Sequence, residues 1–357
     1  MARSAYLDLA AAGLRMPIGV HLVLHGHADP DAILLDGARL GAVIAETARR
    51  FSTPLAMPLM DLTLEKAALL LACGVPAAEV DSHHFTTAPE PPDRLPLTPR
   101  MDASCAAIAR VSIQPGLIPM GMSIGPFSLM TKLVADPITP VFLAGSGLTA
   151  AEDAEVDLVE RMLALGERII HRYLHAQIDA GARAIIVCEP AANLVYFSPL
   201  QLQVNPELFE RFVMAPMQRI SRLLADRGVD LVFHDCGELT DDMIRRFDTL
   251  GSVMLSLGSS RQLWRDAALV SKQTVLFGNL PTKRFCSGEL TVAEVARLSG
   301  ELIEKMQAAG HPFILGSECD VLSVPGRERE ILGKVDALMG CSCPAGSDCA
   351  HSAGSAA

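Results

Sequence analysis

Aromatic residues and long apolar runs are both scarce in this sequence. Only 4% of the 357 residues are Phe, Trp or Tyr, and there is a single Trp. A membrane helix needs about 20 consecutive, mostly apolar residues. The most apolar stretch, residues 117–145, is broken by prolines, glycines, Lys132 and Asp136. We therefore expect no membrane-spanning segment.

Positive charge is also in deficit. The chain has 30 Lys and Arg against 41 Asp and Glu, which gives a formal net charge of −11. Such an acidic chain is poorly suited to bind nucleic acid or an anionic membrane. The N-terminus carries Asp8 and Arg15 and has no small-residue cleavage site after an apolar core. We therefore predict no signal peptide and a cytoplasmic location, where the nine cysteines are expected to be ligands or nucleophiles rather than disulfides.

Short apolar runs bounded by turn residues alternate with segments of helical period. Half of the residues are apolar, which is enough for a large core. The runs lack the polar alternation of a half-exposed sheet, so we interpret them as buried parallel strands. They cover residues 17–24, 54–60, 117–124, 184–187, 230–233, 252–257, 274–277 and 312–315.

Helices are expected between these runs, at 36–51, at 62–73 and from Thr149 to about residue 180. Thr149-x-x-Glu152 is a start signal for the last of these, and Thr291-x-x-Glu294 predicts a capping box further on. Eight strand–helix units are the count of a (β/α)8 TIM barrel, an α/β fold. An open doubly wound sheet is the alternative.

We predict a single barrel domain over residues 1–340. Residues 81–110 fit no strand–helix unit and are expected to form an N-terminal excursion from the barrel. Residues 341–357 are low in complexity and are predicted to be a flexible tail. The tail contains Cys341, Cys343, Cys349 and His351, but it lacks the flanking strands of a zinc ribbon.

Two predicted strands end in residues that bind soft metals. Residues 231–238 read LVFHDCGE, and residues 313–320 read FILGSECD. Residues two apart on a strand point the same way, so His234 and Cys236 can share one ion. Carboxyl ends of barrel strands meet at one face, which brings Cys319 to the same place. One imidazole and two thiolates suit zinc, and ordinary buried core is the alternative interpretation.

The donor set lacks a fourth strand-end ligand. Structural zinc sites have four protein ligands, whereas catalytic sites leave a position for substrate. Glu238, Glu318 and Asp320 are close enough in sequence to support the ligands or to act as a weak fourth one. The vacancy favours a metal that activates an incoming thiol.

Five other residues follow predicted strands and are candidates for the same face. Asp61 and Glu189 are candidate catalytic groups, although Asp61 can simply cap a helix. His25, Phe127 and Asn279 are candidate substrate-binding residues. In the loop after Asn279, Lys283 and Arg284 are able to hold an anionic group, or are merely solvated.

Several motifs occur in a characteristic order along the chain. They are Met-Asp-Leu-Thr-Leu-Glu (60–65), Ile-Gly-Pro-Phe (124–127), Phe-His-Asp-Cys-Gly (233–237), Gly-Asn (278–279) and Gly-Ser-Glu-Cys-Asp (316–320). Together they resemble the uroporphyrinogen decarboxylase superfamily. Within it, the chain is most similar to the zinc-dependent corrinoid methyltransferases of the methylcobamide:coenzyme M type, over about residues 15–340.

The resemblance implies a barrel whose zinc ligands fall on His234, Cys236 and Cys319. It also implies methyl transfer between a cobamide, carried by a corrinoid protein as partner, and a small thiol or similar molecule. The Asp-x-His-x-x-Gly signature of cobamide carriers is missing from the sequence, so this chain is not expected to hold cobamide alone. The sequence does not fix the oligomeric state, and a homodimer is compatible with it.

The sequence departs from the family pattern in three places. His25-Gly-His27-Ala stands where the decarboxylases carry an arginine motif, which argues against tetrapyrrole decarboxylation. Leu-Pro-Thr follows Asn279 where an acidic residue is common, and residues 255–258 lack a common carboxylate. The methyl donor, the acceptor and the direction of transfer stay open. A metal-free lyase of the decarboxylase type and a non-catalytic corrinoid- or tetrapyrrole-binding protein are the alternatives.

Overall fold

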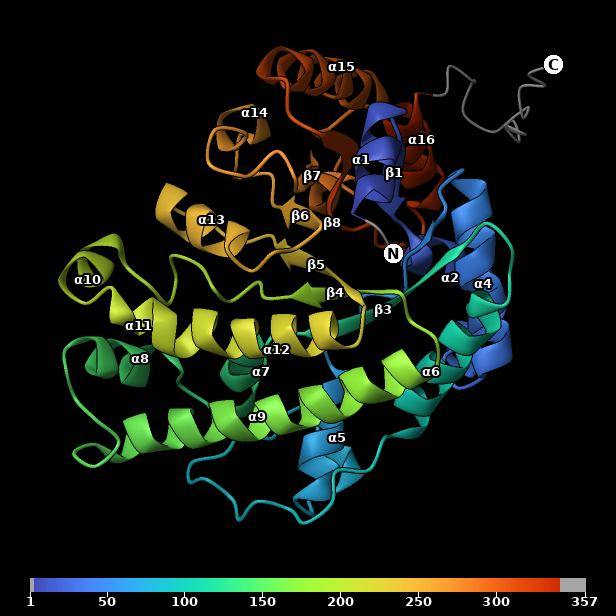
Figure 1. The fold of residues 1–357 in the computed structure, drawn as a ribbon. Helices are drawn as coiled ribbons and strands as arrows, with labels where there is room; N and C mark the ends of the chain where they lie inside the picture. The colour runs from blue at the N-terminus through green and yellow to red at the C-terminus, as the bar shows by residue number, and fades with distance from the viewer. Residues whose placement is uncertain (1–2, 341–357) are drawn as a thin grey trace.

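The computed structural model describes residues 3–340 as a curled parallel sheet surrounded by helices (Figure 1). The eight strands run in the order β1-β8-β7-β6-β5-β4-β3-β2, so β1 and β2 are the two edges. The prediction of an α/β barrel-like fold is confirmed at this level. The strands are β1 (Arg15–Ile18), β2 (Leu55–Ala56), β3 (Ile118–Ile124), β4 (Ala184–Cys188), β5 (Asp230–Asp235), β6 (Met254–Leu257), β7 (Val275–Leu280) and β8 (Phe313–Asp320).

Helices cover the outer surface of the curled sheet (Figure 1). The capping box predicted at Thr291 and Glu294 begins α15, and Gly310 ends it with a positive φ of 60°. The outer helices are α4 (Gly37–Arg50), α5 (Leu64–Ala72), α6 (Pro99–Ser112), α7 (Pro126–Leu133), α8 (Ile138–Gly145), α9 (Ala154–Asp179), α12 (Ala215–Asp226), α13 (Asp241–Asp248), α14 (Leu263–Asp266), α15 (Val292–Ala309) and α16 (Glu328–Met339). Shorter helices are α2 (Val20–Leu24), α3 (Pro30–Ile33), α10 (Pro199–Val204) and α11 (Glu207–Phe209).

Alternate residues of a strand face opposite sides of the curled sheet. On β4, Ala184, Ile186 and Cys188 join an apolar cluster inside the curl, to which all eight strands contribute. Ile185 and Val187 instead join the larger cluster under the outer helices. This period of two decides which strand-end residues can face the interior.

An N-terminal helix, α1 (Ser4–Ala11), closes the end of the curl at which the strands begin. Tyr6 is fully buried in the inner cluster, and its hydroxyl donates to Asp230 over 3.0 Å. Arg3 donates to the carbonyl groups of Gly251, Ser252 and Gln273, each at 2.8 Å. In Figure 1 this helix lies in front of the strands near the N label.

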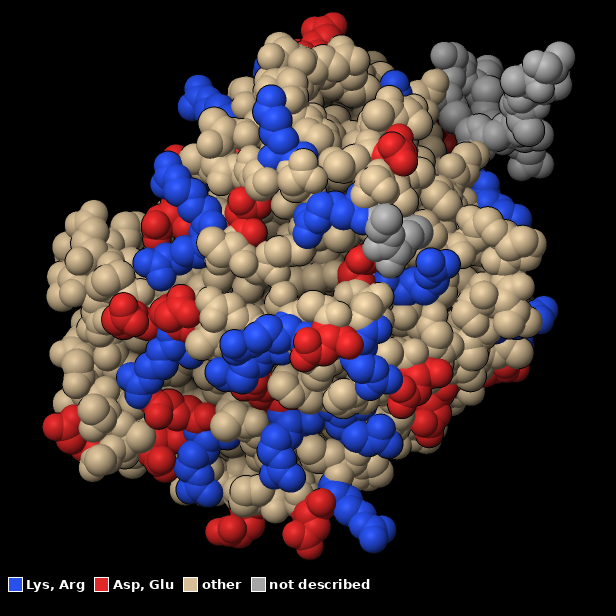
Figure 2. Space-filling model, in the orientation of Figure 1, with Lys and Arg blue, Asp and Glu red and all other residues tan. Residues whose placement is uncertain are grey.

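Charges of both signs are mixed on the face shown in Figure 2. Ion pairs join α9 to α12 and its C-cap residue: Arg219 pairs with Glu167 at 2.5 Å, and Arg227 pairs with Asp179 at 2.6 Å. Within residues 3–340, no helix is long and apolar enough to cross a membrane.

Four sequence predictions differ from the structure. The run 54–60 is a strand only at Leu55–Ala56. The run 17–24 is not one strand, because β1 ends at Ile18 and Val20–Leu24 is helix α2. Helix α9 begins at Ala154 with Asp153 as its cap, whereas Thr149 bonds to Glu152 in the preceding turn. Residues 99–110 of the stretch 81–110 belong to the outer helix α6, which packs on α4. The predicted tail lies outside the described residues.

Candidate functional site

His234, Cys236 and Cys319 come together at the carboxyl ends of β5 and β8. Their nearest ligand atoms all lie within 4.8 Å of one another, close enough to hold one metal ion. The two Sγ atoms are 4.0 Å apart. Two thiolates on a tetrahedral zinc, each about 2.3 Å from the ion, would be about 3.8 Å apart. The donors present therefore fit zinc in both chemistry and spacing.

The two ring nitrogens of His234 have different surroundings. Nδ1 lies 2.8 Å from the hydroxyl of Ser256, the residue directly opposite it in the β5–β6 register. Nε2 is buried and has no hydrogen-bond partner within residues 3–340. A partner on one ring nitrogen orients the other toward a metal. The orphaned Nε2 is therefore the atom placed to bind an ion.

Close backbone packing holds Cys236 in place. A Cβ added to Gly258, just after β6, would lie 2.6 Å from the carbonyl oxygen of Cys236. A Cβ added to Gly237 would lie 2.6 Å from Cβ of Asn193, in the loop after β4. Only glycine permits such approaches, so these two residues set the position of the thiol.

The two thiols of the site are electrostatically linked. The contact with the Cys319 thiol lowers the pKa of Cys236, burial opposes this, and the nearby His234 and Lys283 lower the pKa further. The pKa of Cys319 is raised by that same contact with Cys236 and by burial. Burial alone would lower the pKa of Lys283, but the thiols and Glu318 raise it. The pair therefore loses its first proton much more readily than its second.

Two further sulfur atoms lie near the cluster. Met60 Sδ is 3.9 Å from Cys319 Sγ. Cys188 is fully buried and stands opposite His234 in the β4–β5 register. Burial raises the pKa of the Cys188 thiol well above its usual value, with a smaller contribution from Cys236.

The three acidic residues near the ligands lie outside this group of donors. Glu318 accepts from the amides of Ser259 at 3.1 Å and Lys283 at 3.3 Å, so it ties two loops to β8. Burial raises the pKa of Asp320 to about 7. Glu238 is exposed.

Glu189 directly follows β4, is fully buried, and contacts the first turn of helix α7. Its carboxylate accepts from the amides of Ser128 at 2.5 Å and Phe127 at 3.2 Å. Burial raises its pKa to about 7, although these amides act in the opposite direction. Because Cys188 faces the interior, its neighbour Glu189 faces outward. Glu189 is therefore not one of the grouped donors.

Phe127 and Asn279, the predicted substrate-binding residues, both have structural contacts. The Phe127 ring is fully buried and lies 4.9 Å from the Phe197 ring, centroid to centroid. The Asn279 amide donates to the carbonyl groups of Gly258 at 2.8 Å and Arg261 at 2.9 Å. Asn279 thus supports the same loop end that packs on Cys236.

His25 and Asp61 lie on other elements than the metal ligands. His25 follows helix α2 rather than a strand, is exposed, and stacks on His21 with ring centroids 4.2 Å apart. Asp61 pairs with Arg100 at 2.7 Å and accepts from the Thr63 amide at 3.0 Å. The helix-capping alternative for Asp61 is thus partly realised, two residues before the N-cap Thr63 of α5.

Sequence reasoning missed Ser256, and it found Glu65 in the motif 60–65 but not its burial. Ser256 can be found only from the pairing of β5 with β6, which a single sequence does not give. Glu65 is fully buried and accepts from the Ser123 hydroxyl at 2.7 Å and the Ile124 amide at 3.3 Å. Its second oxygen has no partner within the described chain, and burial raises its pKa to about 7.

Comparisons with known proteins concern the family and the fold. The family model described as uroporphyrinogen decarboxylase matches residues 48–325. The chain is similar to a uroporphyrinogen decarboxylase of Methylibium petroleiphilum, with 29% identity over 166 residues. That match spans 45% of this chain and only 41% of the relative.

A solved methyltransferase from Methanosarcina mazei has the same fold. It superposes with a TM-score of 0.66, covering 95% of this chain and 98% of that one, at 15% identity. At this identity the likeness is one of fold. The family model covers most of the chain, and the chain belongs to the uroporphyrinogen decarboxylase family.

Proposed function

We propose that this protein is a zinc-dependent methyltransferase that moves a methyl group between a corrinoid on a partner protein and a small thiol or similar molecule. The observation that carries the proposal is the grouping of a buried, orphaned imidazole nitrogen with two thiols. The fold shared with a methyltransferase supports the same reaction class.

The residues of the chain have separate roles in this proposal. His234, Cys236 and Cys319 hold the ion, and Ser256 orients the imidazole. Zinc with two thiolate ligands and an open position would lower the pKa of a substrate thiol and keep it as a nucleophilic thiolate. The Lys283 ammonium offsets the negative charge that gathers there.

The partner follows from what the reaction needs. The sequence carries no cobamide-binding signature. The corrinoid is therefore proposed to arrive on a second protein, and the methyl donor or acceptor as a free small molecule. Glu189 and Asp61 stay candidate catalytic residues under this proposal. Neither is proposed to bind the ion.

Metal analysis tests the proposal directly. We expect about one zinc per chain in the purified protein, and loss of most of it in Cys236→Ser and Cys319→Ser. Cys73→Ser is the matched control, because that thiol lies at the end of α5, away from the cluster. A wild-type protein without stoichiometric zinc would contradict the proposal.

A kinetic assay identifies the acceptor. Methylcobalamin demethylation is measured against a panel of small thiols, with and without a chelator. We expect thiol-dependent demethylation that both cysteine variants lose and Cys73→Ser retains. If no thiol supports turnover in zinc-loaded protein, the methyl-transfer assignment is wrong even though the metal site exists.

Metal-free decarboxylation is the second candidate, favoured by the family and by the relative from Methylibium petroleiphilum. It predicts that the protein removes carbon dioxide from a tetrapyrrole. This activity would survive treatment with a chelator and would not need Cys319. The paired thiols have no role in that reaction, which is why we place it second.

A further inference from the structure

Met60 brings a third sulfur atom to the candidate metal ligands. Its Sδ lies 3.9 Å from Cys319 Sγ, and Cys319 Sγ lies 4.0 Å from Cys236 Sγ. Two sulfur ligands of a tetrahedral zinc, each about 2.3 Å from the ion, would be about 3.8 Å apart. Both spacings at Cys319 therefore match the spacing between two ligands of one ion.

Met60 reaches Cys319 from another side of the curled sheet than Cys236 does. It follows β2, one edge of the sheet, whereas Cys319 belongs to β8, which lies next to the opposite edge strand β1. Cys236 follows β5, which is separated from β8 by β6 and β7. The Met60 side chain packs against the apolar cluster inside the curl. Donors that converge in this way from different sides are able to surround an ion.

The backbone around Met60 gives its side chain this direction. The Asp61 amide donates to the Leu59 carbonyl oxygen at 3.1 Å, which closes a three-residue turn centred on Met60. Asp61 itself pairs with Arg100 at 2.7 Å. The carboxylate of this turn is thus engaged with another helix, and the thioether is the donor that contacts a thiol of the site.

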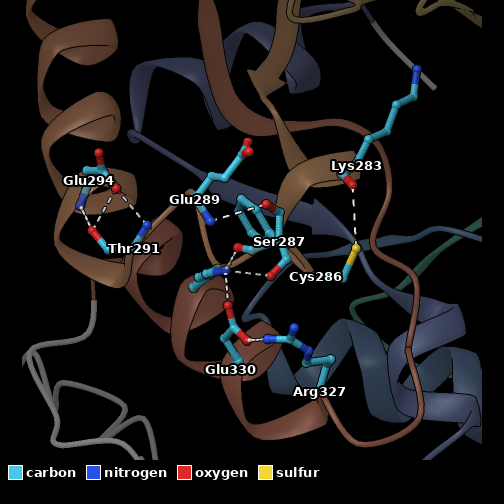
Figure 3. Close-up of polar contacts among 10 residues, drawn as sticks. Lys283, Cys286, Ser287, Glu289, Thr291, Glu294, Arg327 and Glu330 are labelled. Atoms are coloured by element: carbon cyan, nitrogen blue, oxygen red, sulfur yellow. Dashed lines mark hydrogen bonds and ion pairs between the residues drawn. The ribbon is translucent and has the colours of Figure 1, made fainter.

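The other donors at this face leave the fourth position to Met60. In the described part of the chain, no further His, Cys, Asp or Glu joins the three grouped donors. Glu318 instead accepts from the amides of Ser259 and Lys283. The Cys286 thiol, in the connection after β7, lies 3.8 Å from the carbonyl oxygen of Lys283 (Figure 3). The fourth ligand that the described chain offers is therefore a thioether.

We propose that Met60 is a fourth, weak ligand of the ion held by His234, Cys236 and Cys319 in the substrate-free protein. The inference rests on the proposed function, because it concerns the same ion. A thioether is a soft donor like the two thiolates, but it carries no charge and is a weak electron-pair donor. Such a ligand occupies the fourth position without closing it permanently, as a third thiolate would, and a substrate thiol is able to replace it.

X-ray absorption at the zinc edge tests the proposal on selenomethionine-labelled protein loaded with zinc. Selenium scatters X-rays differently from sulfur, so a selenoether ligand is distinguished from the two thiolates. We expect a selenium neighbour of the zinc in wild type and its loss in Met60→Leu. Leu and Met have similar volumes, so this variant should keep the packing. Zinc without a selenium neighbour in wild type, or with one in Met60→Leu, would overturn the proposal.

Met57→Leu is the matched control. Met57 lies in the same connection and is buried in the same inner cluster. This variant should keep both the selenium neighbour and the wild-type zinc affinity. Met60→Leu should lose zinc affinity by about 10-fold, the lower end of what groups around metal ligands contribute, because the thioether is a weak donor. Equal zinc affinities in the two variants would contradict the proposal.

Excess 2-mercaptoethanol tests whether the ligand is weak. Its sulfur is expected to replace the Met60 selenoether on the zinc, and the thiol proton is released to solvent. The selenium neighbour should therefore disappear from wild type. A selenium neighbour that persists would make Met60 a permanent ligand and would overturn the proposal.

These measurements separate the inference from the proposed function. A protein that takes up no zinc would defeat both. Zinc bound without a selenium neighbour would defeat the inference alone. Zinc bound with a selenium neighbour, but without thiol-dependent demethylation of methylcobalamin, would support the inference and defeat the proposed function.

Discussion

At the residue scale, the site depends on groups that touch a ligand rather than on the ligands alone. The hydroxyl of Ser256 is the partner of His234 Nδ1, at 2.8 Å. This contact fixes the ring rotation and leaves Nε2 for the ion. A residue that no motif indicates is therefore as important to the geometry as the motif itself.

Removal of that hydroxyl should weaken metal binding. We expect Ser256→Ala to lower zinc affinity by about 10-fold to 100-fold, because the imidazole loses the contact that orients it. The measurement is a competition titration with a chelator. Ser252→Ala, in which a buried hydroxyl without a partner within the described chain is removed, serves as control. Equal affinities for the two variants would argue against the orienting role.

Glu65 gives the stability of the protein a pH dependence. Its folded pKa of about 7 lies above that of an unfolded glutamate, so the folded state binds more protons between about pH 4.5 and pH 7. The free energy of unfolding therefore falls as pH rises through this window. Glu65→Gln removes this contribution and should stabilise the protein at pH 8 by up to about 3 kcal/mol relative to wild type.

Urea unfolding at pH 5 and pH 8 checks this result. Glu189 and Asp320 have raised pKa values as well, so they remain as a shared background in both proteins. Glu304→Gln, at an exposed position on α15, is the control and should keep the wild-type slope. If the free energy of unfolding of Glu65→Gln changed with pH as much as that of wild type, the buried Glu65 carboxyl would not titrate in this range.

Sequence reasoning found the three grouped donors but not the direction of every neighbour. His234 and Cys236 are two apart at a strand end, so their common direction could be predicted. Cys319 followed from the same rule for parallel strands. For Glu189 the reasoning stopped at the strand end and did not extend the alternation from Cys188, which places the carboxylate outward. Ser256 required the strand register.

At the element scale, buried strands were easier to predict than the connections between them. Runs such as those of β4 and β5 are apolar on both faces, so their pattern is unmistakable. The segment before His25 is also mostly apolar but forms α2, because a run of five residues with four apolar ones fits a helix as well as a strand. The start of α9 differed because two capping signals, at Thr149 and at Asp153, follow each other closely.

The strand ends β5 and β6 should be sensitive to added volume. A Cβ at Gly258 would lie 2.6 Å from the Cys236 carbonyl oxygen, so Gly258→Ala must shift one of the two backbones. We expect zinc affinity to fall by about 10-fold, although no ligand is changed. Gly300→Ala, on α15 with open space around it, should leave affinity unchanged. An unaffected Gly258→Ala variant would mean that Cys236 tolerates the movement.

At the scale of the whole molecule, the two ends of the curled sheet have different tasks. The candidate site lies where strands end, and α1 closes the end where strands begin. In barrels, residues at the first end serve function and those at the second serve stability. Substitutions at the end that carries the candidate site should therefore change zinc affinity, whereas substitutions at the α1 end should change the free energy of unfolding.

Tyr6 tests this separation. Tyr6→Ala removes a fully buried aromatic ring and should lower the free energy of unfolding by about 3 to 5 kcal/mol. Tyr6→Phe loses only the hydrogen bond to Asp230 and should cost about 1 kcal/mol. Zinc affinity of the folded variants should match wild type. A large loss of affinity in Tyr6→Phe would show that the two ends are coupled.

The distance along the chain between the two thiols has a consequence for folding. Cys236 and Cys319 are 83 residues apart in sequence and 4.0 Å apart in space. In an open chain this separation is rarely closed, so the three donors meet only after β5, β6, β7 and β8 have assembled. Any ion held by them is therefore a reporter of native topology, and its release under denaturant would mark the moment at which this half of the sheet comes apart.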